Sequence, residues 1–585
     1  MIVMSKIKAV TAGLKVIEAW GVKNIYGLPG GSFDDGMQAI YERRETLNFV
    51  QVRHEEAGAL AAAAEGKLTG KVGVTFGSAG PGAVHLLNGL YDAKHDHTPL
   101  LAIVAQVPTK RMNLDFFQAM DEEPIFDDVS VWNRTAMSAK AIPGMIDEGI
   151  RQAYKYRGVA VITIPKDLGW TEIDDNFVPT ADNKPEVIYP TPDDAKISAA
   201  WDLIKDAKAP LVYFGQGAKD AGAELSELAK KFKMPLVSSM LGKGIVPDED
   251  DNYLGVTGRV GSKPAVEAGF SPDVVLWIGN DSPFSIFLIK HGAKVIQIDA
   301  DTEKLGKRHP VDVAILADAK TALKALIAKG SDLPETPFYQ ATMANLKNWR
   351  DWTNSFNNDT STPLRPEPVF DQINKLASDK AVYALDVGNV DINFTRLMKL
   401  HDDQKWTTSG QYATMGYGVP ASIAAKFAFP ERDVYSLSGD GGFAMLGEEI
   451  LTQVKYNLHI TNIVFSNETL GYIEAEQTDD SHQPLSGVDL IDTDWAQVAT
   501  GMGATGITVR TFDELKAALK QAQAADGPVV IDIKSTHDMP FTTEHMDLNP
   551  AHATKEAVAA FTAKYQADAL KPYSYFVEQV NKNSK

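Results

Sequence analysis

The chain has 585 residues, which is too long for a single hydrophobic core and predicts three or four domains. Its 57 lysines and arginines stand against 77 aspartates and glutamates, and a net charge of −20 disfavours binding to nucleic acid or to anionic lipid. The absence of cysteine excludes disulfides, thiolate metal sites and cysteine nucleophiles. The longest aliphatic run, residues 99–105, is too short to span a bilayer, and the first residues show no signal-peptide pattern. We therefore expect a cytoplasmic protein without stable membrane association.

Short apolar runs that end in Gly, Ser, Asn or Asp alternate with helix-length amphipathic stretches, which predicts α/β domains with doubly wound parallel sheets. The first group of runs is "KNIYGLPGG", "VGVTFGSAGPG", "PLLAIVAQ" and "VAVITIPKDL", and a linker is predicted at 174–194. The second is "PLVYFGQG", "PLVSSM", "VVLWIGN", "KVIQIDAD" and "VAILAD", followed by a second seam at 354–369. The third is "AVYALDVGN", "VYSLSGDGG", "TNIVFSN" and "PVVIDIKS". The predicted domains are 1–185, 190–335 and 355–540, with a helical tail at 541–585.

The run "SLSGDGGFAML" contains a glycine turn between a strand and a helix. Gly439, Gly441 and Ala444 match the dinucleotide pattern G-x-G-x-x-G/A, but a single match also fits a tight turn with no ligand. Asp440 argues against a bare pyrophosphate, because two like charges ~4 Å apart repel by about 4 kcal/mol at an effective dielectric of 20. A divalent cation between them would remove that cost, and Mg²⁺ favours oxygen ligands. Asn467, at the end of the next predicted strand, can supply a second one.

The sequence "GDGG" followed by Asn467, 27 positions after Asp440, resembles the fingerprint of thiamine diphosphate (ThDP)-dependent enzymes. One departure is Ser466, which stands where the family usually has a first Asn. The resemblance implies ThDP and Mg²⁺ as cofactors, with Asp440, Asn467 and the carbonyl of Thr469 as metal ligands. It also implies that the diphosphate is bound near Gly388, Asn389, Gly441, Gly442 and Gly471.

In "VRHEEAGALAAAAEGKL", Glu55 resembles the acid that activates ThDP by exchanging a proton with its pyrimidine ring. A solvated charge favoured by the helix dipole is the alternative interpretation of this residue. The runs "YGLPGG" and "GSAGPGAVHLLNGLYDAKHDHTPLLAIVAQ" resemble pyrimidine-binding segments, which implies cofactor contacts at Gly30, Ser78 and His85. The "HDH" within the latter is interpreted as a loop rather than a metal site. Family members complete this site across a subunit interface, so a homo-oligomer is expected, a tetramer built as a dimer of dimers.

Met415 resembles the bulky residue that holds the cofactor in a bent shape, although a methionine filling a core gap has the same signature. In the middle segment, "TGRV", "NDSPF", "QIDAD" and "ILADAKTAL" resemble the FAD-binding domain of the pyruvate oxidase and acetohydroxyacid synthase families. Taken one at a time, these residues are equally consistent with turns. The resemblance implies FAD contacts at Thr257, Gly258, Arg259, Val260, Asn280, Asp281, Ser282, Pro283, Phe284, Asp299, Asp318 and Ala319.

Two further segments favour the oxidase. "MNLDFFQAMDEEPIFDDV" resembles a pyruvate oxidase segment whose Phe-Gln pair lies near substrate and flavin, here Phe117 and Gln118. "ETLGYIEAEQ" resembles the segment that presents an aromatic residue, often Phe, and a glutamate, here Tyr472 and Glu476. The alternatives are an ordinary core for Phe117 and a solvated helix face for Glu476.

The resemblance thus implies oxidative decarboxylation of pyruvate with phosphate and O₂, which yields acetyl phosphate, CO₂ and H₂O₂. Three alternatives remain open at this point. The first is an acetohydroxyacid synthase-type carboligase, in which FAD is structural. The second is a catalytically silent protein with the same fold. The third is a quinone-linked peripheral membrane enzyme, which would require an amphipathic tail that the sequence provides only weakly.

Overall fold

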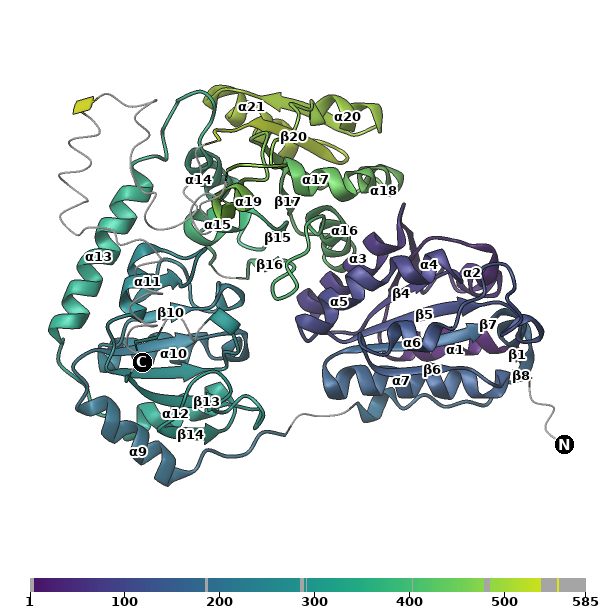
Figure 1. Cartoon of the computed structure of the whole chain (residues 1–585), viewed down its shortest axis with the longest axis horizontal. Helices are drawn as coiled ribbons and strands as arrows, with labels where there is room; N and C mark the ends of the chain where they lie inside the picture. Colours follow the sequence, from purple (N-terminus) through teal and green to yellow (C-terminus); the bar gives the residue numbers. More distant parts are fainter. Residues whose placement is uncertain are drawn as a thin grey trace.

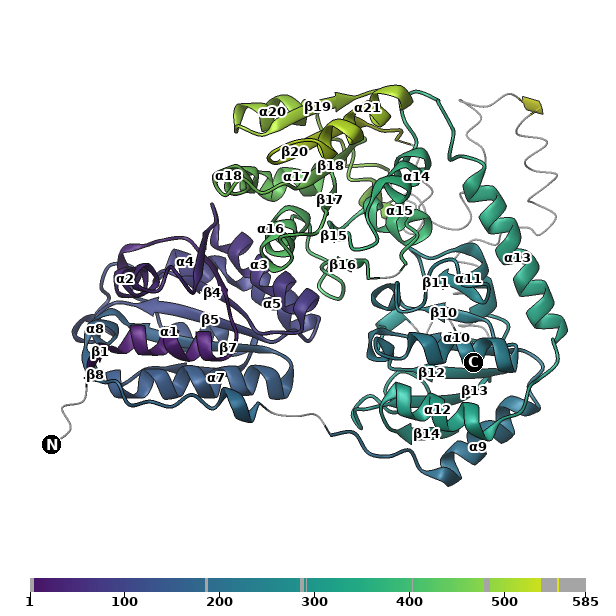
Figure 2. The same cartoon turned by 180° about the vertical axis from the view of Figure 1, so that it is seen from behind.

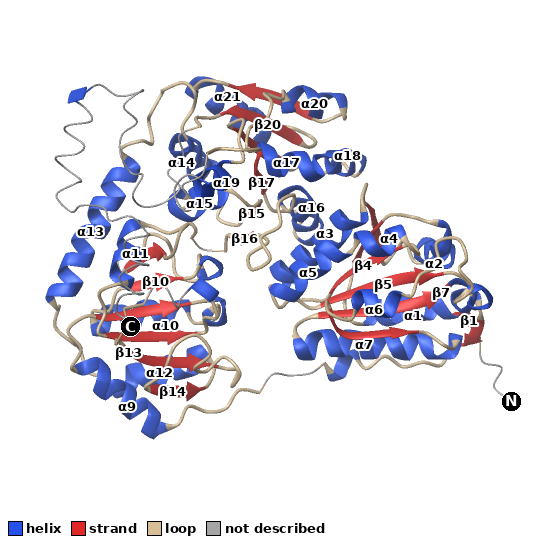
Figure 3. Cartoon of the chain, viewed as in Figure 1, coloured by secondary structure: helices blue, strands red, loops and turns tan. Residues whose placement is uncertain are grey.

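The computed structural model describes residues 5–184, 188–284, 289–290, 292–401, 403–477, 484–537 and 555–556. Over these residues the chain forms three six-stranded parallel sheets, each flanked by helices (Figures 1 and 3). The predicted α/β class with three doubly wound domains is confirmed. A separate antiparallel pair joins β1 (Lys6–Lys8) to β8 (Glu172–Asp174), so the predicted linker begins inside a short strand. The predicted helical tail lies almost entirely outside the described residues.

The sheet of the first domain has the strand order 3-2-4-5-7-6. Its strands are, in that order, β3 (Asn48–Gln51), β2 (Asn24–Gly27), β4 (Gly73–Gly77), β5 (Leu100–Gln106), β7 (Val159–Pro165) and β6 (Ser130–Thr135). Its helices are α1 (Ala9–Ala19), α2 (Asp34–Glu42), α3 (Glu55–Thr69), α4 (Pro81–His85), α5 (Leu87–His95), α6 (Glu122–Phe126), α7 (Ile142–Tyr156) and α8 (Lys166–Trp170). The central strands β5 and β7 are buried along their whole length, as their unbroken apolar runs predict.

The central domain has the order 11-10-9-12-13-14. Its strands are β11 (Tyr253–Val256), β10 (Leu236–Ser238), β9 (Pro210–Phe214), β12 (Val274–Ile278), β13 (Lys294–Asp299) and β14 (Val313–Leu316). Its helices are α9 (Asp194–Lys205), α10 (Gly222–Phe232), α11 (Lys263–Gly269) and α12 (Ala319–Lys329), and α13 (Pro337–Asn354) leads out of it. Figure 1 shows α13 running up the outer side of this domain toward the third.

The third domain has the order 16-15-17-18-20-19. Its strands are β16 (Lys405–Thr407), β15 (Val382–Leu385), β17 (Val434–Gly439), β18 (Thr461–Ser466), β20 (Val529–Lys534) and β19 (Thr505–Val509). Its helices are α14 (Pro366–Leu376), α15 (Asn389–Leu397), α16 (Gly418–Ala428), α17 (Asp440–Leu446), α18 (Ile450–Lys455), α19 (Gly471–Ala475), α20 (Trp495–Gly501) and α21 (Phe512–Gln523). The predicted second seam is a loop until α14 begins at Pro366.

The first and third domains pack through α3 and α16, which lie against each other in both Figure 1 and Figure 2. Both helices are rich in alanine, and small side chains allow two helix axes to approach closely. As a result, one continuous hydrophobic core contains Leu60 of α3 and Ile423 of α16. Within the described ranges, no helix combines the length and the apolar character needed to cross a membrane.

Candidate functional site

The predicted metal ligands lie at adjacent strand ends of the third domain. Strands β17 and β18 pair in parallel with Gly439 opposite Phe465, so that Asp440 and Asn467 follow neighbouring strands at the same sheet edge. The Asp440 carboxylate accepts hydrogen bonds from the Gly441 N–H at 2.9 Å and the Glu468 N–H at 2.8 Å. The Asn467 side-chain oxygen faces the N–H of Thr469 at 3.4 Å. Two oxygen-bearing side chains thus lie at one sheet edge, as the spacing of the motif predicts.

The residues at this edge suit a diphosphate-bound magnesium ion. Asp440 is 5% exposed, and its burial raises the pKa of the carboxyl group, so a cation would stabilise the ionised form. Side-chain oxygens of Asn389 and Asp391 are buried here without a hydrogen-bond partner. A Cβ on Gly471 would lie 2.2 Å from the Asn389 amide nitrogen, so glycine keeps this space open. Hard oxygen donors beside unpartnered polar groups are the donor set that Mg²⁺ and phosphate groups require.

Two other glycines shape the same edge. Gly388 has a φ of 136°, which L side chains rarely adopt, and its N–H donates to Asp391 at 3.2 Å. A Cβ on Gly442 would lie 2.8 Å from the carboxylate of Asp386. Asp386 in turn accepts the N–H groups of Gly416 and Gly418 at 2.9 and 3.2 Å. The segment around Met415 is therefore tied to the strand end that carries Gly388.

A large cavity of about 1530 Å³ extends from this edge to the carboxyl ends of the central domain's strands. It exceeds the usual volume of a site for one drug-sized ligand, which is roughly 300–1,000 Å³. Every residue predicted to contact FAD lines it, and so does every predicted metal and diphosphate residue. Lys94–His97 and Lys155–Gly158 of the first domain contribute to its wall as well. The predicted flavin and diphosphate residues therefore share one cavity.

The acidic residues predicted to contact FAD differ in their partners. Asp281 forms ion pairs with Lys304, Lys307 and Arg308, and although burial alone would raise its pKa, these hydrogen bonds lower the pKa to about 2. Asp299 ends β13, and burial raises its pKa. Asp318 instead caps α12 by accepting the N–H groups of Lys320 and Thr321. The structure thus assigns a helix-capping role to Asp318 independently of any ligand.

Arg259 joins the central domain to the third. Its guanidinium forms an ion pair with Glu476 at 3.2 Å and lies 5.7 Å from the ring centre of Tyr472. The Glu476 side chain is 41% exposed, and its carboxylate is paired across a domain boundary. Tyr472 and Glu476 both line the cavity, next to Asn467.

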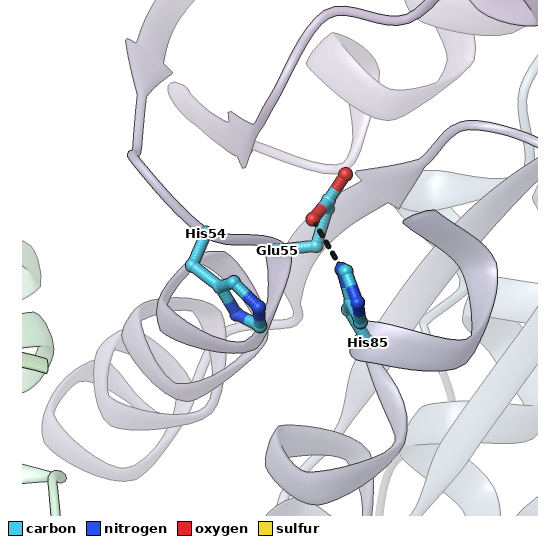
Figure 4. Close-up of side chains that lie close together, drawn as sticks. All are labelled: His54, Glu55 and His85. Carbon is cyan, nitrogen blue, oxygen red and sulfur yellow. Dashed lines mark hydrogen bonds and ion pairs between the residues drawn. The ribbon is translucent and has the colours of Figure 1, made fainter. Parts of the chain in front are cut away.

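The predicted residues of the first domain gather around Glu55. Glu55 is 7% exposed at the first position of α3, and a hydrogen bond of 3.0 Å joins its carboxylate to Nδ1 of His85 (Figure 4). A Cβ on Gly82 would lie 2.9 Å from this carboxylate, and one on Gly30 would lie 2.3 Å from the Ser78 hydroxyl. The alternative of a solvated Glu55 is excluded by its burial. A buried carboxylate that faces glycines has the space around it that a bound ring would need.

His54 stacks on His85, with ring centres 4.4 Å apart and ring planes 28° apart (Figure 4). Together with Glu55 the two histidines could offer metal ligands within 4.8 Å of one another. Imidazole lone pairs lie in the ring plane, so two nearly parallel rings do not direct them at a common ion. We therefore interpret the group as a carboxylate supported by an imidazole rather than as a metal site.

Gln118 has a φ of 60° and packs beside Gly80, whose added Cβ would lie 3.1 Å from the Gln118 carbonyl oxygen. This brings Gln118 to the loop that carries Ser78. Phe117 is 77% exposed, so the alternative of an ordinary core position for it is wrong. A phenylalanine exposed to this extent next to a site is available to contact a ligand or another chain.

The two groups of predicted residues do not share one space within the chain. Among the described residues that line the large cavity, none comes from the group formed by Gly30, Glu55, Ser78, His85 and Gln118. The residues predicted to contact FAD and the diphosphate therefore line one cavity, and the predicted residues around Glu55 lie outside it.

Two polar networks between the first and third domains were not predicted. Lys67 is bonded to Asp92 at 2.7 Å, Asp96 at 2.6 Å and the Thr408 carbonyl at 2.8 Å. Asp96, the middle residue of "HDH", also accepts N–H groups from Gly410 and Gln411, so it fastens a loop of the third domain. Glu449 forms the second network, beside Glu55. The partners that lie in different domains are hundreds of residues apart, and no local sequence signal indicates them.

Family models of three domains match the chain in order. The "thiamine pyrophosphate enzyme, N-terminal TPP binding domain" matches residues 7–125. The "thiamine pyrophosphate enzyme, central domain" matches residues 197–326, and the "thiamine pyrophosphate enzyme, C-terminal TPP binding domain" matches residues 386–533. The last match contains Asp440 and Asn467, and the first contains Glu55.

Similarity to characterised relatives extends over nearly the whole chain. The chain is 43% identical to a pyruvate oxidase of Lactiplantibacillus plantarum over 580 residues. These matched residues cover 98% of this chain and 96% of the relative. It is 31% identical to a "probable acetolactate synthase large subunit" of Methanocaldococcus jannaschii, over 90% of this chain and 91% of that one. It is 30% identical to an acetolactate synthase of Arthrospira platensis, over 91% of this chain and 95% of that one. The chain is a ThDP-dependent enzyme and belongs to the thiamine pyrophosphate enzyme family.

Proposed function

We propose that this protein is a pyruvate oxidase of the phosphate-using type. In the proposed reaction, pyruvate, phosphate and O₂ give acetyl phosphate, CO₂ and H₂O₂, with ThDP, Mg²⁺ and FAD as cofactors. The observation that carries the proposal is the 43% identity to a pyruvate oxidase over 98% of the chain, against 31% to the acetolactate synthase of Methanocaldococcus jannaschii. The cavity shared by the predicted flavin and diphosphate residues supports it, because an oxidase needs its redox centre close to the site of decarboxylation.

The chain's own residues have distinct tasks in this proposal. Asp440, Asn467 and the Thr469 carbonyl would hold Mg²⁺, and the backbone around Gly441 and Gly388 would receive the diphosphate. When bound, ThDP supplies the electron sink for decarboxylation, and FAD accepts the electrons. Glu55 would hold and exchange a proton at the pyrimidine ring, oriented by its hydrogen bond to His85.

The substrate side is assigned to two polar and two aromatic residues. Gln118 and Glu476 would orient pyruvate or phosphate by hydrogen bonds, and Phe117 and Tyr472 would shield the reacting atoms from water. Glu476 is held by Arg259 at 3.2 Å, so its position relative to the central domain is already set before a ligand binds.

We propose further that the enzyme acts as a homo-oligomer, a dimer of dimers, in the cytoplasm. The separation of the Glu55 group from the Asp440-lined cavity supports this, because a second copy is required to bring the two together. The exposed Phe117 belongs to the same loop as Gln118 and would then lie at the contact between copies.

Anaerobic addition of pyruvate to the purified yellow protein tests the proposal. The flavin absorbance should bleach and then return on admission of air, with H₂O₂ formed and with acetyl phosphate appearing only when phosphate is present. An acetohydroxyacid synthase would instead couple two molecules of pyruvate without peroxide. A flavin that stays oxidised after pyruvate would refute the oxidase assignment.

A further inference from the structure

The turn that presents Glu55 is held by a residue of the third domain. Glu449 is fully buried in the 3-10 turn η8 (Gly447–Glu449), which follows directly after α17. Its Oε1 accepts the N–H of Arg53 at 2.6 Å and the N–H of His54 at 3.2 Å. Its Oε2 accepts the hydroxyl of Thr452 at 2.6 Å. Both oxygens of this buried carboxylate therefore accept hydrogen bonds. Two of the three donors are backbone N–H groups of the residues just before Glu55.

The two amide groups need this acceptor because of their place in the chain. Arg53 and His54 lie after the end of β3 and before the first residue of α3, where neither a sheet ladder nor a helix supplies a carbonyl. A buried N–H without an acceptor is destabilising, so each amide is stabilised by the carboxylate. Hydrogen bonds to an ionised acceptor are also roughly twice as strong as those to a neutral one.

The next helix holds the same segment at a second point. The Tyr456 hydroxyl, just after α18, accepts the N–H of Gln51 at 2.8 Å and donates to the carbonyl of Phe49 at 2.9 Å. The segment 49–54 is thus bonded at both ends to the stretch 449–456 of the third domain. Side-chain packing alone would leave the position of this turn along the domain boundary undetermined, whereas directed hydrogen bonds to Glu449, Thr452 and Tyr456 fix it.

The charge environment of Glu449 is consistent with this role. Burial raises the pKa of Glu449 to about 7 and the like charge of Glu448 adds to this, while the bonds from Thr452, Arg53 and His54 lower it. A carboxylate retained in a fully buried position must be compensated by such bonds, because isolated burial of the ion is strongly unfavourable.

We propose that Glu449 is a positioning residue for Glu55, acting across the domain boundary through the amides of Arg53 and His54. The inference rests on the proposed role of Glu55 as the activating acid. Asp440 begins the helix that leads into η8, so one short segment carries both a proposed metal ligand and the support for the acid. Glu449 itself contacts neither substrate nor cofactor; it keeps the Glu55 carboxylate in reach of His85.

Substitution of Glu449 in the full-length enzyme loaded with ThDP, Mg²⁺ and FAD tests this inference. Glu449→Ala should lower kcat with pyruvate by roughly tenfold to a hundredfold, because a displacement of about 1 Å at a catalytic group has an effect of this size. Glu449→Gln keeps an acceptor oxygen of the same reach and should stay within about threefold of the wild type. The affinity for Mg²⁺–ThDP, measured by titration of the cofactor-free protein, should remain within about twofold in both variants, because the diphosphate ligands are unchanged.

Hydrogen–deuterium exchange supplies a readout that does not depend on activity. Peptides covering residues 49–55 should exchange faster in Glu449→Ala than in the wild type or in Glu449→Gln. Glu448→Ala is the matched control, since Glu448 is adjacent and acidic and no hydrogen bond or ion pair from it to residues 49–55 is seen, and it should leave exchange and kcat unchanged. If Glu449→Ala does not fold, Tyr456→Phe removes the acceptor of the Gln51 N–H with less disruption and should still speed exchange and lower kcat severalfold.

The outcomes separate this inference from the proposed function. A wild-type enzyme that does not oxidise pyruvate overturns the function, and the exchange measurement then still tests whether Glu449 holds the turn. Equal kcat and equal exchange in Glu449→Ala and the wild type would overturn the positioning role. A parallel loss of cofactor affinity and activity in both Glu449 variants would do so as well, because it would indicate general damage.

Discussion

Mixing two inactive variants would show whether the active site is built from two chains. Glu55→Gln removes the proposed proton-exchanging acid, and Asp440→Asn removes the charge of a proposed metal ligand. In the structure these residues belong to separate groups, since the cavity beside Asp440 is lined by no described residue of the Glu55 group. If a symmetric partner supplies Glu55, a mixed dimer contains one site with both residues intact and one site with both substituted.

The size of the recovery follows from this geometry. Random pairing of equal amounts of the two chains makes about half of the dimers mixed, and each mixed dimer has one intact site in two. About a quarter of the wild-type activity should therefore return before tag selection, and about half if only mixed dimers are retained. Each variant alone should be nearly inactive. The two chains would be co-expressed with different affinity tags, purified through both, and assayed by flavin bleaching with pyruvate. Doubly tagged oligomers without activity above that of the single variants would refute the two-chain site.

Three further measurements test other properties of the protein. Glu122 of α6 is buried, which raises the pKa of its carboxyl group to about 8. The pKa of Glu122 in the folded protein lies above its value in the unfolded chain. The contribution of Glu122 to stability is therefore fully present below about pH 4.5 and is lost as the pH rises through about 8. The free energy of unfolding should fall by roughly 5 kcal/mol at most over this range. Glu122→Gln should remove this slope in urea unfolding measured between pH 5 and 8.5, and an unchanged slope would contradict the assignment. Lys67→Met leaves Asp92 and Asp96 buried without their cation and should cost about 3–5 kcal/mol, read as a lower Tm, whereas a Tm equal to that of the wild type would show that the network is dispensable. Asp440→Asn should abolish the rise in Tm that Mg²⁺ and ThDP together produce, while Glu55→Gln should retain it; loss in both or in neither would disprove the separation of their roles.

The sequence predicted the interior of each sheet and missed strands at the edges. Strands such as β7, "VAVITIP", are continuous apolar runs because both faces are covered by helices. Most strands at the open edges have one unpaired side and a mixed composition, so neither an apolar run nor strict alternation marks them, whereas the edge strand β14 was predicted from its apolar run "VAILAD". The strands that the sequence analysis did not predict are β3, β6, β11, β16 and β19, each of which lies at an edge of its sheet, together with the short pair β1 and β8.

In the candidate site too, contacts between residues close in the sequence could be predicted, whereas contacts between distant residues could not. Asp440 and Asn467 could be placed together because each follows a strand of the same predicted strand–helix–strand unit, and parallel pairing brings such strand ends to one edge. The bonds of Glu449 to Arg53 and His54 could not be predicted, because they join residues about four hundred positions apart in different domains. Phe117 illustrates a third case, since its aromatic character fits a core position and only the fold shows that it is exposed.

The sequence by itself determined the class of fold, the order of the three domains and the oxygen-rich edge formed by Asp440 and Asn467. All of these depend on periodicity and on spacing within a single strand–helix–strand unit, where chain connectivity limits the possible geometry. The tertiary structure alone decided that Arg259 pairs with Glu476, that Glu55 is buried against His85, and that Glu55 and Asp440 do not share one cavity within the chain. These relations arise where separately folded domains pack, and packing is governed by complementary surfaces that no local pattern encodes.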